Sequence, residues 1–243
     1  MEAAQLDQEN LFKWRHYAPE IILLGVRWYL RYSLSYRDLE EMMAERGLQV
    51  DHTTIYRGVQ RYAPELEKRV RPHLKQTNDS WRVDETYIKV HGDWYYLYRA
   101  VDSAGNTLDF VLSPTRDARS AAYFFRKLLG DTQVAVPQVI NGDGTAAYPA
   151  AFKTRQAMGE LEPECELRPV KYLNNIVEQD HRVIKRRVKP GWGLAWYRTA
   201  WATRQGYEAM NQLRKGRVEG TSKGDIVSQV RLSTAPSASL PKQ

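Results

Sequence analysis

The feature that most constrains the fold is the stretch from Trp81 to Val90 (WRVDETYIKV), in which apolar and β-branched residues surround two acids. Residues of this kind favour a pleated, half-buried strand. A carboxylate in the middle of such a strand costs free energy unless it is paired or coordinated, so Asp84 requires a compensating group. Glu85 would point to the opposite face of the strand, which means that one of the two acids could simply be exposed.

Two further acids stand in comparable settings. Asp143 follows a short apolar stretch, 137–140, that predicts a strand, and Glu178 lies in a stretch, 175–182, that predicts a helix. Each has an ordinary explanation by itself, Asp143 as a turn residue and Glu178 as the partner of Arg182 four residues on. The three acids are separated by 59 residues (143 − 84) and 35 residues (178 − 143), so only the fold can bring them together.

We predict that Asp84, Asp143 and Glu178 form one catalytic and metal-binding site. Phosphodiester cleavage requires an activated attacking oxygen and a stabilised leaving oxygen, and two divalent ions can provide both. Carboxylate oxygens are the ligands that Mg²⁺ prefers. The predicted cofactor is therefore a pair of Mg²⁺ ions, with Mn²⁺ as an alternative.

The part of the chain around these acids predicts an α/β domain. Its expected elements are strands at 82–90, 94–101 and 107–113, a helix at 117–129, a strand at 137–140, a helix at 146–156, a weaker strand at 166–170 and a helix from 174. The first three strands are joined by short turns and predict an antiparallel meander. This order is that of a ribonuclease-H-like core, a mixed sheet with flanking helices.

The region before this core predicts an all-α module. Apolar residues recur at helical spacing over 20–32, Ser35 and Asp38 predict a capping box, and Asp51 offers a cap for a third helix. A further helix is expected to begin at Pro64. Three short helices with a tight turn describe a helix-turn-helix, although any trihelical cap has this pattern. In a DNA-binding module the start of the last helix meets base edges, and we predict contacts from His52, Thr53, Thr54 and Arg57.

Changes in composition define the expected boundaries. They predict an N-terminal tail (1–19), a helix-turn-helix domain (20–76), a ribonuclease-H-like catalytic domain (77–217) and a disordered tail (218–243) rich in Ser, Gly, Lys and Pro.

The net charge of +7 predicts a polyanionic partner, with double-stranded DNA the first candidate. The charge is concentrated in residues 171–217, which hold eleven basic residues against three acidic ones. Lys185 follows Glu178 by two helical turns and therefore shares its face. DNA contacts are predicted for Arg182, Lys185 and Arg186.

The sequence also excludes several classes of protein. A single cysteine, Cys165, rules out a disulfide framework and a multi-cysteine zinc site. The apolar run at 21–26 is too short to cross a bilayer. We therefore expect a cytoplasmic protein that has no membrane partner and associates with the nucleoid when it binds DNA.

Several ordered motifs resemble one known family. They are WYL (28–30), SYRDL (35–39), DHTTIYR (51–57), WRVDETY (81–87), YRAVD (98–102), AYP (147–149), KYLNN (171–175) and EQDH (178–181). Together they are similar to the DDE transposases of the insertion-sequence-six family, over nearly the whole chain from about Phe12 to Arg217. The family usually has tryptophan where Gly58 stands and lysine where Gly144 stands.

The resemblance implies a bacterial transposase. Its helix-turn-helix would bind the terminal inverted repeats of an insertion sequence, and Asp84, Asp143 and Glu178 would be the metal-binding triad. The implied reaction is cleavage and transfer of DNA strands into target DNA by replicative transposition. Because two DNA ends must be held together, at least a homodimer is expected.

Two other functions are compatible with the same residues. One is a non-catalytic helix-turn-helix repressor whose inactive ribonuclease-H-like domain serves for dimerisation. The other is a general nuclease of the ribonuclease-H type, which would leave the N-terminal module without a role.

Overall fold

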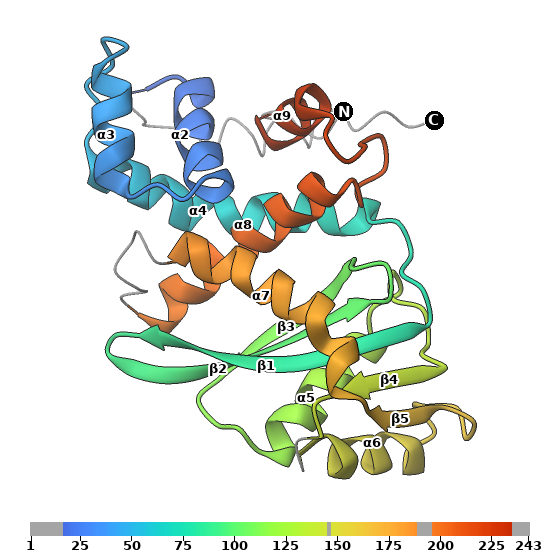
Figure 1. Cartoon of the computed structure of the whole chain (residues 1–243). Helices are drawn as coiled ribbons and strands as arrows, with labels where there is room; N and C mark the ends of the chain where they lie inside the picture. Colours follow the sequence, from blue (N-terminus) through green and yellow to red (C-terminus); the bar gives the residue numbers. More distant parts are fainter. Residues whose placement is uncertain (1–16, 145–146, 189–195, 235–243) are drawn as a thin grey trace. The chain divides into compact units, whose positions relative to one another are not determined.

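The computed structural model describes residues 17–144, 147–188 and 196–234 (Figure 1). It divides into two compact units. The sheet unit runs from Lys75 to Arg186, and the helical unit combines the chain up to Leu74 with the described residues from Arg187 on. The expected catalytic domain, 77–217, therefore differs from the sheet unit at its end, because the helix after residue 196 packs with the N-terminal helices.

The sheet unit contains a five-stranded mixed sheet in the order β3-β2-β1-β4-β5. Strands β1 (Ser80–Val90), β2 (Asp93–Asp102) and β3 (Thr107–Ser113) form the predicted antiparallel meander. Strands β4 (Val139–Gly142) and β5 (Glu166–Pro169) continue the sheet in parallel. This topology confirms the predicted ribonuclease-H-like arrangement.

Helices α5 (Ala118–Leu129) and α6 (Ala147–Ala157) cover one face of the sheet (Figure 1). The core on this face includes Trp81 and Val83 of β1, Phe124 of α5 and Phe152 of α6. Because side chains alternate along a strand, Glu85 points to the same face as Trp81 and Val83, whereas Asp84 points to the other. A short helix η2 (Lys171–Asn174) and helix α7 (Asn175–Val188) follow β5, and contacts of α7 reach that second face.

The helical unit begins with α2 (Pro19–Arg31), α3 (Tyr36–Ala44) and α4 (His52–Val70), followed by η1 (Arg71–His73). The predicted capping box is present, since Ser35 N donates to Asp38 at 2.7 Å and Asp38 N donates to the Ser35 hydroxyl at 3.1 Å. Asp51 caps α4 as predicted. Helices α8 (Tyr197–Lys215) and α9 (Ile226–Thr234) complete the unit.

Two glycines let the helices of this unit approach closely. A Cβ on Gly58 would lie 3.3 Å from Val26 Cγ2, so a tryptophan at this position of α4 would meet α2. A Cβ on Gly206 of α8 would lie 2.6 Å from Ala63 Cβ and 2.8 Å from the Leu30 methyl groups. The neighbouring helix therefore leaves no room for a side chain at Gly206, whereas at Gly58 an added Cβ would only make a tight contact.

Two predictions in this region are wrong. No new helix begins at Pro64, because α4 continues through it, and the buried side chains of Ala63, Leu66 and Val70 extend its apolar face across the proline. Burial of that face offsets the backbone hydrogen bond that proline cannot make. The segment 218–234 is not disordered, since it contains α9, and Arg27 Nε donates to the Ser233 hydroxyl at 3.0 Å. Residues 1–16 and 235–243 of the two predicted tails lie outside the described residues.

Among the helices of the described ranges, none combines the length and apolar character needed to span a membrane.

Candidate active site

Strand pairing brings two of the predicted acids together. Strand β4 pairs in parallel with β1 so that Asn141 lies opposite Arg82, and two further steps in this register place Asp143 beside Asp84. One carboxylate oxygen from each of Asp84, Glu85 and Asp143 lies within 4.8 Å of the other two. We refer to these three residues as the acid cluster.

Glu85 is anchored, not exposed. Its side chain is only 2% exposed, and each of its carboxylate oxygens accepts a hydrogen bond. Arg116 Nε donates to Oε1 at 2.6 Å, and the Tyr148 hydroxyl donates to Oε2 at 2.5 Å. Arg116 precedes α5 and Tyr148 belongs to α6, so Glu85 links β1 to both helices on its face of the sheet.

Arg116 also partly neutralises the acid cluster. A terminal nitrogen of its guanidinium lies 3.8 Å from Asp143 Oδ2. Burial alone would lower the pKa of Arg116, but the hydrogen bond and charge of Glu85, with the charge of Asp143, outweigh it and raise the pKa. Burial and then the charge of Glu85 raise the pKa of Tyr148 well above its usual value. Both groups therefore remain protonated donors.

Gly144 extends the backbone beside the acid cluster in a left-handed conformation, with φ of +88°. Glycine adopts this conformation without strain, whereas a lysine there would not. The departure from the family pattern at this position is therefore suited to the local backbone.

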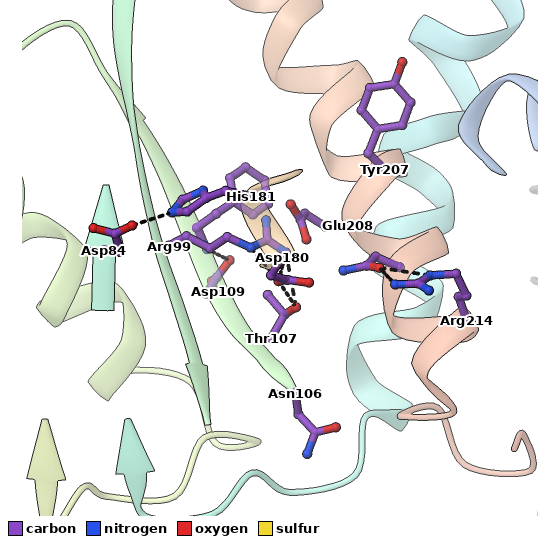
Figure 2. A network of polar contacts seen from close by, with 12 residues as sticks. Asp84, Arg99, Asn106, Thr107, Asp109, Asp180, His181, Tyr207, Glu208 and Arg214 are labelled. Carbon is purple, nitrogen blue, oxygen red and sulfur yellow. Dashed lines mark hydrogen bonds and ion pairs between the residues drawn. The ribbon is translucent and has the colours of Figure 1, made fainter. Parts of the chain in front are cut away.

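The structure does not place Glu178 within the acid cluster. Glu178 is exposed in the first turn of α7, and neither of the two groups of acids and histidine that could hold a metal ion in the described chain, Asp84 with Glu85 and Asp143 or Glu40 with Asp51 and His52, includes it. His181, three residues later on α7, is buried and its Nε2 lies 3.4 Å from Asp84 Oδ2 (Figure 2). Glu178 is thus about 4.5 Å along the helix axis from a residue that touches the cluster.

Two buried polar side chains, those of Asn174 and Asp180, hold α7 against the sheet. Asn174, just before α7, donates from its side chain to the Val83 carbonyl at 3.3 Å. Asp180 accepts from Arg99 Nε at 2.6 Å and from the Thr107 hydroxyl at 3.0 Å (Figure 2). Arg99 and Asp180 belong to two of the sequence motifs, and the structure pairs them. Their effect is to fix the position of α7 beside Asp84.

The residues predicted to bind DNA differ in how accessible they are. At the start of α4, Thr53 and Arg57 are exposed, whereas His52 and Thr54 are half-buried. His52 Nδ1 lies 3.0 Å from Glu40 Oε2, a contact that the sequence did not predict. On α7 the exposed basic residues are Arg182, Lys185 and Arg186.

Sequence reasoning missed two residues of this site, Tyr148 and Arg116. Tyr148 stands in the motif AYP, so a signal was present without a role attached to it, whereas His181 in the motif EQDH was a weak candidate because its position on the helix is near the face of Glu178. Arg116 lies in a connection between β3 and α5 that carries no motif, and only the fold reveals that it contacts the acid cluster.

Comparisons with known proteins match most of the chain. A family model described as "DDE domain", of the IS240 transposase type, matches residues 78–217. The transposase for insertion sequence-like element IS431mec of Staphylococcus aureus is 43% identical over 178 residues, 73% of this chain and 78% of that protein. The transposase for insertion sequence element IS257 in transposon Tn4003, also of Staphylococcus aureus, matches to the same extent.

Similar solved structures include viral integrases. The catalytic core domain of the HTLV-2 integrase in complex with magnesium is 18% identical with a TM-score of 0.43, covering 61% of this chain and 95% of that one. A simian T-cell lymphotropic virus intasome in complex with a PP2A regulatory subunit is 16% identical with a TM-score of 0.45, covering 69% of this chain and 57% of that one.

Proposed function

The chain belongs to the insertion-sequence-six family of DDE transposases, and we propose on this premise that it binds the terminal inverted repeats of an insertion sequence and cleaves and transfers DNA strands with divalent metal ions. The acid cluster carries the proposal. Asp84, Glu85 and Asp143 bring carboxylate oxygens within 4.8 Å of one another at the edge where β1 and β4 pair.

The residues of the acid cluster fit a hard divalent cation. Each pair of full negative charges at this separation repels by at least about 3 kcal/mol at an effective dielectric constant of about 20. Arg116 relieves this repulsion at Glu85 and at one oxygen of Asp143, which leaves Asp84 and Asp143 to hold Mg²⁺ or Mn²⁺. Two such ions, when bound, would activate the attacking oxygen and stabilise the leaving oxygen of a phosphodiester.

Glu178 completes the set of ligands in this proposal, and Glu85 is a positioning residue. Both oxygens of Glu85 already accept hydrogen bonds, from Arg116 and Tyr148. Glu178 is exposed and stands one helical turn before His181, which contacts Asp84. In this proposal the carboxylate of Glu178, on the first turn of α7, would reach the metal, while Glu85 orients the arginine beside Asp143.

DNA binding in this proposal involves both units, each through its own basic surface. Arg182, Lys185 and Arg186 on α7 would neutralise phosphates of the reacting strand. The start of α4 would enter a major groove of the terminal repeat, with Thr53 and Arg57 exposed toward base edges and His52 and Thr54 supporting them. Replicative transposition needs two ends and a target, so the active species would be at least a homodimer.

The test is cleavage of DNA that carries the inverted repeats flanking the reading frame, compared with DNA of scrambled ends. Asp84→Ala, Asp143→Asn and Glu178→Gln should abolish Mg²⁺-dependent cleavage and leave repeat binding intact in gel-shift assays. Glu164→Gln, which changes an exposed acid after α6, is the matched control and should cleave normally. Glu85→Gln should reduce cleavage without abolishing it.

Full cleavage by both Asp84→Ala and Asp143→Asn would refute the catalytic assignment. Binding of the repeats by the wild-type protein without nicking in Mg²⁺ would indicate the repressor function instead. Equal cleavage of scrambled ends would indicate a general nuclease.

A further inference from the structure

The hairpin of β1 and β2 carries two exposed aromatic rings that the proposed reaction does not use. Tyr87 is 57% exposed and Trp94 is 55% exposed. Their ring centroids are 5.1 Å apart with an interplanar angle of 86°. Lys89 Nζ lies 5.3 Å from the Trp94 ring centroid, and Lys185 Nζ of α7 lies 5.2 Å from that of Tyr87. We call these four residues the aromatic patch.

The aromatic patch contributes little to the core of the sheet unit. That core is formed further back on the same strands, where Trp81, Val83 and Tyr98 are fully buried. Adjacent exposed aromatic rings leave apolar surface in water and are typical of a binding site. The patch is therefore better explained by a ligand than by folding.

The aromatic patch lies close to the acid cluster along two elements. On β1, Tyr87 follows Asp84 by three residues, or about 10 Å, and lies on the face of Glu85, the other β1 residue of the acid cluster. On α7, Lys185 follows His181 by one turn, and these two residues contact Tyr87 and Asp84 respectively. A distance of about 10 Å corresponds to about three nucleotides of one B-form strand. DNA held at the acid cluster would thus present a nearby nucleotide to the patch.

In the part of the chain that the structure describes, the edge of β1 that carries Asp84 and Tyr87 is unpaired on one side, so a DNA strand could extend along it from the acid cluster to the patch. Strand β4 pairs with β1 only at Ser80, Trp81 and Arg82. Beyond them, the described sheet has no strand on that side of β1, and this is the part that carries Asp84 and Tyr87. Lys185 reaches Tyr87 in this same region.

The chemistry of the patch selects nucleic acid over protein. Unpaired bases stack on aromatic side chains with little regard to sequence, and neighbouring cations neutralise the phosphates. Interfaces between proteins are depleted in lysine, whereas here a lysine lies over each aromatic ring. More than half of the surface of Tyr87 and of Trp94 is still exposed.

We propose that the aromatic patch binds an unpaired nucleotide of the reacting strand, stacking its base on Tyr87 or Trp94 while Lys89 and Lys185 hold the flanking phosphates. The proposal rests on the proposed function, since it assumes that the acid cluster acts on DNA. It adds that the DNA is locally unpaired about three nucleotides from the bond that is cut.

The test separates base stacking from charge. The full-length protein is titrated with a fluorescent single-stranded oligothymidylate of about ten nucleotides and with an abasic strand of the same length and charge. Because stacking contributes about 1–3 kcal/mol per base, the wild-type protein should bind the abasic strand about 5-fold to 150-fold more weakly. Tyr87→Ala and Trp94→Ala should lose most of this difference, and Trp94→Phe should keep it.

Tyr123→Ala is the matched control. Tyr123 of α5 is also exposed, at 49%, and the Arg126 guanidinium lies 5.3 Å from its ring centroid. This variant should bind both strands as the wild-type protein does. Circular dichroism checks that each variant is folded, which is expected because each changed side chain is exposed.

Three outcomes decide the proposal. Equal affinity of the wild-type protein for both strands would overturn it, because binding would then depend on charge alone. The proposal would also be overturned if Tyr87→Ala and Trp94→Ala bind DNA as the wild-type protein does but have a lower molecular mass than the wild-type protein in light scattering. The patch would then be an interface between copies of the chain. Base-dependent binding that these variants lose would support it, and absent cleavage of repeat-containing DNA in the same preparation would refute only the proposed function.

Discussion

Replacing Asp180 by alanine removes the carboxylate that holds α7 against the sheet. Asp180 pairs with Arg99, whose side chain has 0% exposure, while that of Asp180 has 6% exposure. The same carboxylate accepts from the Thr107 hydroxyl at 3.0 Å. The variant therefore removes the Asp180 carboxylate from a buried guanidinium and one acceptor from Thr107.

The expected loss of stability follows from this burial. Breaking a buried ion pair by removing one partner costs about 3–5 kcal/mol, because the remaining charge stays desolvated. The exposed pair of Glu166 and Arg168, at 59% and 57% exposure, is the matched control, since pairs of this kind contribute at most about 1 kcal/mol. Asp180→Ala should thus be far more destabilising than Glu166→Ala.

The assay is urea unfolding followed by far-ultraviolet circular dichroism. A double variant, Arg99→Met with Asp180→Leu, removes both charges and should recover most of the lost free energy of unfolding. Since α7 carries Glu178 and His181, Asp180→Ala should also reduce strand cleavage. A loss below about 1 kcal/mol for Asp180→Ala, equal to that of Glu166→Ala, would refute the reasoning that this pair fixes α7.

Three further predictions concern other parts of the chain. Gly206→Ala should lower the free energy of unfolding by about 1–3 kcal/mol because its Cβ would overlap a neighbouring helix. Gly58→Ala should change the free energy of unfolding by less than about 1 kcal/mol, because a gain in helix propensity offsets a tighter contact. The midpoints of urea unfolding measure both changes. Burial, followed by the charge of Glu85, raises the pKa of Tyr98 from 10.0 to about 12. The folded state therefore keeps a proton that the unfolded state loses, so the free energy of unfolding should fall as the pH rises from 10 to 12. In this pH range the phenolate absorbance should rise as the protein unfolds. In the presence of a chelator, Arg116→Gln should unfold at a lower temperature than the wild-type protein, because the acids of the cluster lose the positive charge of the guanidinium. Added Mg²⁺ should then raise the melting temperature of the variant more than that of the wild-type protein. Equal shifts of the two melting temperatures would contradict this.

Local structure was predictable wherever it depends on neighbouring residues. The capping box of Ser35 and Asp38, the cap at Asp51 and the turn between β1 and β2 involve groups within four residues of one another, and all three are present. Predictions based on local composition were wrong where distant contacts decide. Helix α4 continues through Pro64 and α9 forms in a polar segment, because each buries side chains against helices far away in the sequence.

The amino-acid sequence by itself determined the strands and helices of the sheet unit and indicated Asp84 and Asp143, since an acid in or after an apolar strand is conspicuous without a fold. Only the tertiary structure decided which other groups surround them. Glu85 proved to be anchored by Arg116 and Tyr148. Glu178 remained outside the acid cluster while its helix was held by the pair of Arg99 and Asp180. The physical reason is that these contacts join residues 31, 63 and 81 positions apart, and no local propensity encodes which buried charges will meet.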